Sequence, residues 1–255
     1  MPRSGTTILA RLMANHSRVR RIIEPYQTKR SAGYDVTSVG ALCADFGVKE
    51  ESGFSLLVKE TTTRGDNIRL LHQLMEGAAL ENYRVGYVLV LRSPLEAFLS
   101  QVDAAQSLWT RKSAFSRDRA SLKAFWNVFV ASIGIHLEHA LRFHRRIAFY
   151  DAFALSPRSE IARLMGLFGY PIEPDQLRLS EDAEFGGDPG AGAATDNFLP
   201  RTDRSSAIES MAREFGSLAE FGKMWRLHEY TKDALNYRKS SDAIVRDLAL
   251  LVQMP

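Results

Sequence analysis

The sequence predicts an α/β protein in which a parallel central sheet lies between two layers of helices. Residues 54–59, 85–91 and 146–150 form short, nearly continuous apolar runs, which are typical of parallel strands covered on both faces. Helical patterns separate these runs, and the connections exceed the roughly one dozen residues that a parallel crossover requires. We therefore expect a three-layer fold.

Apolar residues that recur on one face predict each helix. The first helix carries Ile8, Leu9, Leu12 and Met13 at the spacing of an amphipathic helix. Further helices are expected at residues 66–79, from Pro94 onward, at 121–143, from Pro157 to Gly169, at 205–216 and at 225–254. Pro94 and Pro157 each suit the start of a helix, because proline lacks an N–H that would be unbonded there.

The length of the chain and the pattern of its sequence favour a single domain. The chain has 255 residues, which fits one large α/β domain. Residues 180–206 are rich in glycine, proline and aspartate and are expected to form a long exposed loop. The remainder contains no repeat and no domain boundary, so we expect one domain over residues 1–255.

Composition narrows the classes of partner. Lys and Arg number 33 against 30 Asp and Glu, a balance that favours a small anionic ligand over nucleic acid. The only cysteine, Cys43, excludes an internal disulfide and a thiolate metal cluster. We find neither a signal peptide nor an uninterrupted apolar run of about 18 to 20 residues, so we expect a cytoplasmic protein without a membrane partner.

A short polar segment predicts an anion-binding loop. Pro2-Arg3-Ser4-Gly5-Thr6-Thr7 directly precedes the first helix, whose N-terminus offers unbonded N–H groups and the positive end of its dipole. Gly5 allows close backbone approach to a phosphate, the threonines add hydroxyl donors, and Arg3 adds a cation. The glycine spacing and lysine of a Walker A loop are absent. The alternative is an ordinary capped helix start.

This loop resembles the phosphosulfate loop of sulfotransferases that use 3′-phosphoadenosine 5′-phosphosulfate (PAPS). The family's loop reads Pro, Arg or Lys, Ser or Thr, Gly, Thr, Ser or Thr, and it follows the first strand. The resemblance implies that Arg3, Ser4, Gly5, Thr6 and Thr7 bind the cofactor. It also implies a P-loop-like sulfotransferase architecture.

A second motif strengthens the resemblance. Val90-Leu91-Arg92-Ser93-Pro94, followed by Ser100, is similar to the family's 3′-phosphate motif. The resemblance implies that Arg92 and Ser100 reach that phosphate, and Arg92 is expected at the carboxyl edge of the sheet, where α/β proteins bind ligands. The alternative is that Arg92 only caps a strand and Ser100 lies on a helix surface.

Weaker similarities extend the likeness across most of residues 2–200. Residues 149–153 with 161–170 resemble the family's strand, acidic turn and following helix. Phe185-Gly186-Gly187-Asp188-Pro189 resembles its nucleotide-covering loop, which implies cofactor contacts from Gly187, Asp188 and Pro189. The last fifty or so residues match nothing in the family.

The implied reaction is in-line transfer of the sulfuryl group from PAPS to a hydroxyl or amine of a carbohydrate or small molecule, without a metal. Arg3 would neutralise charge on the bridging oxygen, and Lys59 resembles a lysine that contacts the phosphosulfate. Glu24 resembles the family's general base, and Glu60 is the runner-up. Alternatively, Glu24 is a turn residue that neutralises Arg20 and Arg21, and Glu60 pairs with Arg64.

The chain departs from the family at its beginning, because Met1 stands where relatives have a buried strand of about five to seven residues. We therefore expect a fold that lacks most of the first strand, and the gap favours a start upstream of Met1. Two further functions stay open: a non-catalytic nucleotide-binding relative and a P-loop kinase or NTPase. Acceptor-binding loops are expected at residues 28–45 and 105–119.

Several histidines and arginines also raise the question of a second site. His136, His139 and His144 lie on one expected helix without the spacing of a metal site, and we interpret them as a solvated polar face. Residues 18–21 and 29–30 are basic and are compatible with an acidic acceptor or with a soluble helix end, of which we favour the latter.

Overall fold

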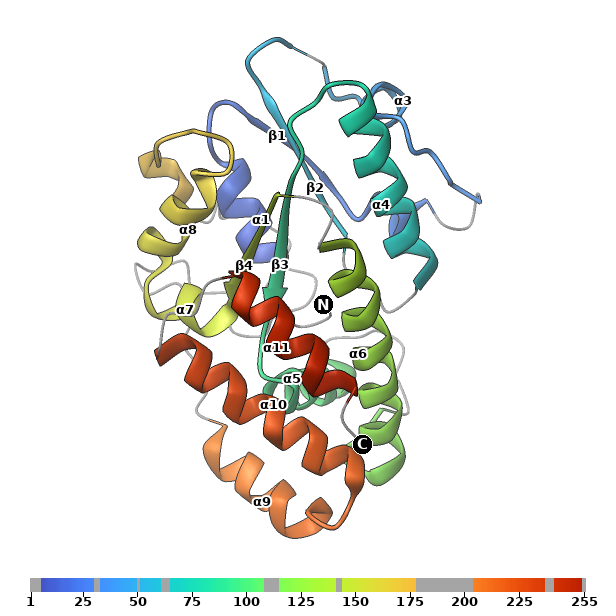
Figure 1. Cartoon of the computed structure of the whole chain (residues 1–255), viewed down its shortest axis with the longest axis vertical. Coiled ribbons are helices and arrows are strands. Elements are labelled where there is room, and N and C mark those ends of the chain that lie inside the picture. The colour runs from blue at the N-terminus through green and yellow to red at the C-terminus, as the bar shows by residue number, and fades with distance from the viewer. Residues whose placement is uncertain are drawn as a thin grey trace.

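Four strands form two short parallel sheets in the described part of the chain. The structure, a computed structural model, describes residues 6–29, 33–49, 51–60, 65–107, 115–140, 144–177, 204–236 and 241–253. Strand β1 (Val19–Ile23) pairs with β2 (Ser55–Lys59), with Val19 opposite Ser55, and β3 (Gly86–Leu91) pairs with β4 (His144–Phe149), with Gly86 opposite His144. Strands of both sheets run toward the same end of the molecule (Figure 1).

Helices lie on both sides of these sheets, and the helices of residues 205–236 form a separate group at one end of the molecule. Their bounds are α1 (Thr6–Ala14), α2 (Pro25–Thr28), α3 (Val39–Asp45), α4 (Gly65–Leu80), α5 (Pro94–Ser107), α6 (Arg119–Ala140), α7 (Tyr150–Leu155), α8 (Pro157–Met165), the 3-10 helix η2 (Pro174–Leu177), α9 (Ser205–Phe215), α10 (Ala219–Asn236) and α11 (Ser241–Gln253). Figure 1 shows α1, α7 and α8 on one side of the strands, α4 and α6 on the other, and α9 and α10 at the far end. The mixed α/β fold with short parallel sheets and flanking helices is therefore confirmed.

Two apolar clusters hold the layers together. The cluster on the α1 side includes Leu12, Val90, Ile161 and Leu164, which are all nearly inaccessible to solvent. The second and larger cluster joins α4, α5 and α6 to β3 and to the C-terminal helices. The predicted amphipathic face of α1 is confirmed, since Ile8, Leu9, Leu12 and Met13 are all buried.

The central sheet is divided, and a cavity of about 690 Å³ lies between β2 and β3. The sequence predicted one central sheet, but no strand bridges β2 and β3 among the residues that the structure describes. The apolar side chains of the two strands differ in burial: Leu89, Val90 and Leu91 of β3 are buried, whereas Leu56, Leu57 and Val58 of β2 are only partly buried. The predicted loss of most of the first strand falls on residues 1–5, outside the described residues, and it stays a prediction together with the full sulfotransferase architecture.

Three other expectations differ from the structure. Residues 19–23 form strand β1, which was not predicted because Arg20 and Arg21 interrupt the apolar run. Residues 150–155 form helix α7 where a turn was expected, and α10 ends at Asn236 before α11 begins at Ser241 instead of continuing as one helix.

Helix α6 contains the one stretch of the described residues, Arg119–Leu137, that could span a membrane by length and composition. Half of that stretch is buried within the protein, as is common for a core helix. Trp126, Phe129 and Ile133 on this helix belong to the larger apolar cluster. Packing within the protein thus accounts for its apolar character.

Candidate functional site

The carboxyl ends of β1 and β2 bring three predicted site residues together. Glu24 directly follows β1, and Lys59 is the last residue of β2. Because the two strands are parallel and Ile23 lies opposite Lys59, both side chains lie at the same edge of the sheet. Thr7, in the first turn of α1, completes the group.

Lys59 is the centre of this group. Its side chain is only 6% exposed, its Nζ donates a hydrogen bond to Thr7 Oγ1 over 3.0 Å, and it forms an ion pair with Glu24 Oε1. Burial lowers the pKa of Lys59, and the negative charge of Glu24 opposes that effect. A cation is therefore held directly at the N-terminus of α1, where the helix dipole also favours negative charge.

The backbone of Glu24 fixes the position of its carboxylate. Glu24 adopts a left-handed conformation (φ 50°, ψ 52°), which is unusual for a residue with a side chain. Its N–H donates to the Lys59 carbonyl oxygen over 2.6 Å, and Pro25 then begins α2. Of the alternative in which Glu24 neutralises Arg20 and Arg21, the part on Arg20 is disfavoured, because Arg20 lies 4.0 Å above the Phe54 ring and 3.9 Å from Glu51. The part on Arg21 stays open.

Glu60 is a second carboxylate at this edge and is almost fully buried. Its Oε2 accepts a hydrogen bond from the Tyr26 N–H over 3.2 Å, while no partner for the buried Oε1 is found among the described residues. Burial, and to a lesser degree the charge of Glu24, raises the pKa of Glu60 to about 7. The hydrogen bond from the Tyr26 N–H and the positive charge of Lys59 act in the opposite direction and lower this pKa. Arg64, its expected partner, lies outside the described residues.

Arg92 and Ser100 lie on a second group of elements. Arg92 directly follows β3, in the predicted place at the carboxyl end of a strand. Its guanidinium lies 4.3 Å above the Tyr150 ring, and its Nε donates to Glu96 Oε2 over 3.4 Å. Ser100 is buried on α5 rather than exposed on a helix surface, so that part of the alternative is wrong. Their roles toward a phosphate stay predictions.

The remaining predicted cofactor residues are Arg3, Ser4, Gly5, Gly187, Asp188 and Pro189, and all of them lie outside the described residues. Thr6 is described as the first residue of α1. The structure thus joins Thr7, Glu24 and Lys59 in one cluster, with Glu60 next to it.

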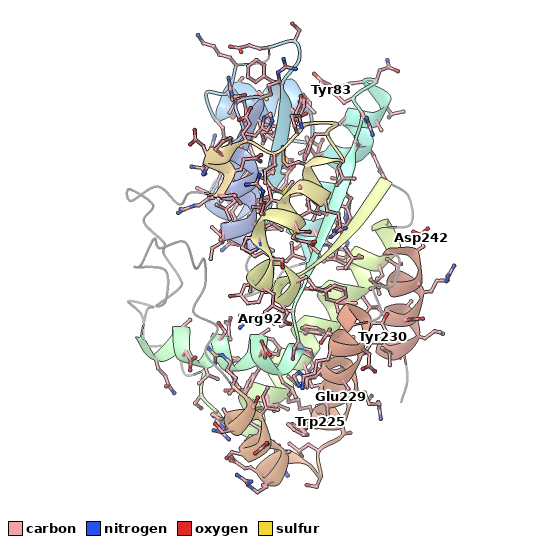
Figure 2. The ribbon with its side chains drawn as sticks, turned by 90° about the vertical axis from the view of Figure 1, so that its left-hand side faces the viewer. Tyr83, Arg92, Trp225, Glu229, Tyr230 and Asp242 are labelled. Carbon is pink, nitrogen blue, oxygen red and sulfur yellow. The ribbon has the colours of Figure 1, made fainter. Side chains whose placement is uncertain are left out.

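A contact that the sequence analysis missed attaches α10 to the Arg92 segment. Ser93 Oγ is 2.6 Å from His228 Nδ1, and it also accepts the Glu96 N–H over 3.4 Å at the start of α5. Both Ser93 and His228 are almost inaccessible to solvent. Figure 2 shows Arg92 at the lower end of β3, with Trp225 and Glu229 of α10 farther down. Ser93 and His228 are 135 residues apart in the sequence, so no local sequence pattern predicts their contact.

The prediction that α6 presents a solvated polar face is wrong at His136. This side chain is buried and forms a hydrogen bond with the Tyr87 hydroxyl. Within the described residues, no group of three or more His, Cys, Asp or Glu side chains is arranged to hold a metal ion.

No protein-family model matches this chain, and no curated protein matches it. The fold and the cluster therefore define only a broad class: an α/β protein with a buried lysine, a helix N-terminus and two carboxylates at the carboxyl edge of parallel strands.

Proposed function

We propose that this protein is a sulfotransferase that moves the sulfuryl group of PAPS to a hydroxyl or amine of a small molecule or carbohydrate. The observation that carries the proposal is the bond from Lys59 to Thr7 at the N-terminus of α1. A buried cation, a hydroxyl and a helix dipole meet there, which is the chemistry that binds a phosphosulfate. The motif resemblance at residues 2–7 and 90–94 supplies the choice of nucleotide.

In the proposed reaction the acceptor oxygen or nitrogen attacks sulfur in line with the bridging oxygen. The bond from sulfur to that oxygen breaks, 3′,5′-ADP leaves, and the acceptor proton passes to a carboxylate. Lys59, the first turn of α1 and Arg3 stabilise the negative charge that develops on the leaving oxygen. Thr6, Thr7, Ser4 and Gly5 hold the phosphosulfate, and Arg92 with Ser100 hold the 3′-phosphate.

The structure favours Glu60 over Glu24 as the general base of this proposal. Glu24 already forms an ion pair with Lys59, whereas Glu60 has a pKa near 7 and a second carboxylate oxygen without a described partner. A base whose pKa lies near the working pH combines availability with proton affinity. Glu24 then serves to hold Lys59 until the nucleotide binds.

Calorimetric titration with 3′,5′-ADP tests the nucleotide site. We expect binding without magnesium, and we expect Lys59→Met to weaken it about 10- to 100-fold, the effect of losing one or two charge-assisted hydrogen bonds. Lys123→Met removes a lysine whose side chain is 64% exposed on α6 and is the matched control. Thr7→Val tests the same contact without removing a charge.

Two outcomes would favour the other functions. Tighter binding of ATP with magnesium than of 3′,5′-ADP would support a kinase or NTPase, although Arg92 follows β3 where magnesium would need a carboxylate. Binding of 3′,5′-ADP with no sulfuryl transfer to any hydroxyl or amine acceptor would support a non-catalytic relative. A folded chain that binds neither nucleotide would refute the proposal.

A further inference from the structure

The basic segment at residues 18–21 occupies a different place in the fold from the expected helix end. Residues 19–23 form strand β1, so the side chains of Arg20 and Arg21 point to opposite faces of the first sheet. Arg20 lies above the Phe54 ring and 3.9 Å from Glu51. Arg21 is exposed on the other face. The two arginines therefore have separate surroundings.

The face of the sheet that carries Arg21 is the one that α1 covers. Arg21 lies opposite Leu57, two residues before the pair formed by Ile23 and Lys59. Because side chains alternate along a strand, Arg21 and Lys59 point to the same side of the sheet. Val19 and Leu57 share this face, and both pack against the apolar cluster that contains the buried residues of α1.

Arg11 brings a third cation to the same side. It follows Thr7 by one turn of α1, and Thr7 accepts the hydrogen bond from Lys59 Nζ. Helix α1 runs against the strands, since its C-terminus leads into the start of β1. One helical turn and two strand residues each span about 6 Å. Arg11 and Arg21 therefore lie at the same height, one turn from Lys59 toward the amino ends of the strands.

The charges in this group affect one another. Burial lowers the pKa of Arg11, and the positive charge of Arg21 lowers it further. The charge of Arg11 also contributes to the lowered pKa of Lys59. Like charges so placed favour the binding of an anion between them, and paired guanidinium groups suit the planar oxygens of a carboxylate or the oxygens of a sulfate.

We propose that Arg11 and Arg21 form an anion subsite that binds an acidic group of the acceptor. This inference rests on the proposed function, which assigns Lys59 and Thr7 to the phosphosulfate and leaves the arginine pair to the second substrate. It specifies an acceptor that carries a carboxylate or sulfate about 6 Å from the hydroxyl or amine that receives the sulfuryl group. A sugar acid has both groups on one ring.

Inorganic sulfate, titrated calorimetrically at low ionic strength into the complex with saturating 3′,5′-ADP, tests the subsite apart from the nucleotide. We expect the native chain to bind a further sulfate ion, and Arg21→Gln and Arg11→Gln each to weaken this binding at least tenfold. Arg20→Gln makes the same change one residue away on the opposite face and is the matched control. None of the three variants should change 3′,5′-ADP affinity more than about twofold.

A matched pair of acceptors then identifies the source of the anion. p-Nitrophenyl glucuronide and p-nitrophenyl glucoside differ in one carboxylate, and the glucuronide should bind the 3′,5′-ADP complex at least tenfold more tightly. Arg21→Gln should abolish this preference, whereas Arg20→Gln should keep it. Equal binding of the two compounds to the native chain would overturn the proposal.

Two further outcomes separate the subsite from the proposed function. A chain that binds 3′,5′-ADP but no further sulfate would overturn the subsite and leave the nucleotide site intact. If Arg21→Gln weakened 3′,5′-ADP binding as strongly as Lys59→Met, the arginine pair would belong to the nucleotide, and its assignment to the acceptor would be wrong. A chain that binds no 3′,5′-ADP would refute the proposed function and this assignment together.

Discussion

At the scale of a single residue, Glu60 makes the stability of the fold depend on pH. A carboxyl group whose pKa is raised in the folded state binds its proton more tightly there than in the unfolded chain. Its contribution to stability is therefore fully present below its unfolded pKa, near 4.5, and is lost as the pH rises through about 7. This direction is opposite to that of a carboxylate in a stabilising ion pair.

Glu60→Gln should remove this dependence. We expect the variant to be more stable than the native chain at pH 8, by on the order of 2 kcal/mol, and the advantage to vanish near pH 4. Urea unfolding at several pH values measures the difference, with Glu209→Gln on an exposed position of α9 as the control. An advantage that stays constant with pH would contradict the assigned pKa.

The same substitution separates the two carboxylates in the proposed reaction. Glu60→Gln should lower the rate of sulfuryl transfer about 100-fold or more with little change in 3′,5′-ADP affinity, and native activity should rise with pH through about 7. Glu24→Gln should mainly weaken nucleotide binding, because it frees Lys59 from its held position. The reverse pattern would identify Glu24 as the base.

At the scale of secondary-structure elements, the packing of its buried face stabilises α1 more than the helix propensity of its residues does. Leu12 is fully buried in the cluster that also contains Val90 and Ile161. Leu12→Ala should cost about 2–5 kcal/mol of unfolding free energy, whereas Leu155→Ala, at a 71% exposed position, should change it by about 0.5 kcal/mol or less. Denaturant midpoints at constant slope measure both.

The start of α5 depends on a helix from the far end of the chain. His228→Ala would leave the buried Ser93 hydroxyl without its imidazole partner, and we expect a loss of about 1–3 kcal/mol. Glu229→Ala, next to it but half exposed, should have little effect. If α10 positions the Arg92 segment, the His228 variant should also weaken 3′,5′-ADP binding, and unchanged affinity would limit His228 to a structural role.

At the scale of the whole molecule, the sequence predicted the elements better than their association. Three strands and the amphipathic α1 follow from local apolar patterns, and Lys59 and Arg92 were placed correctly at strand ends because strand ends are local features. Strand β1 was missed because its arginines interrupt the apolar run. The Ser93–His228 contact and the raised pKa of Glu60 depend on burial by distant segments, which a local pattern does not encode.

The cavity between the sheets also contains the chain's only thiol. Cys43 on α3 lines it and is 3% exposed, so the native protein carries a single chemical reporter inside the space that divides its sheet. Alkylation of Cys43 should be slow, since a buried thiol reacts only when the structure opens locally. Its rate, followed by mass spectrometry, therefore measures how often the cavity is exposed, and any occupant that fills the cavity should slow it further.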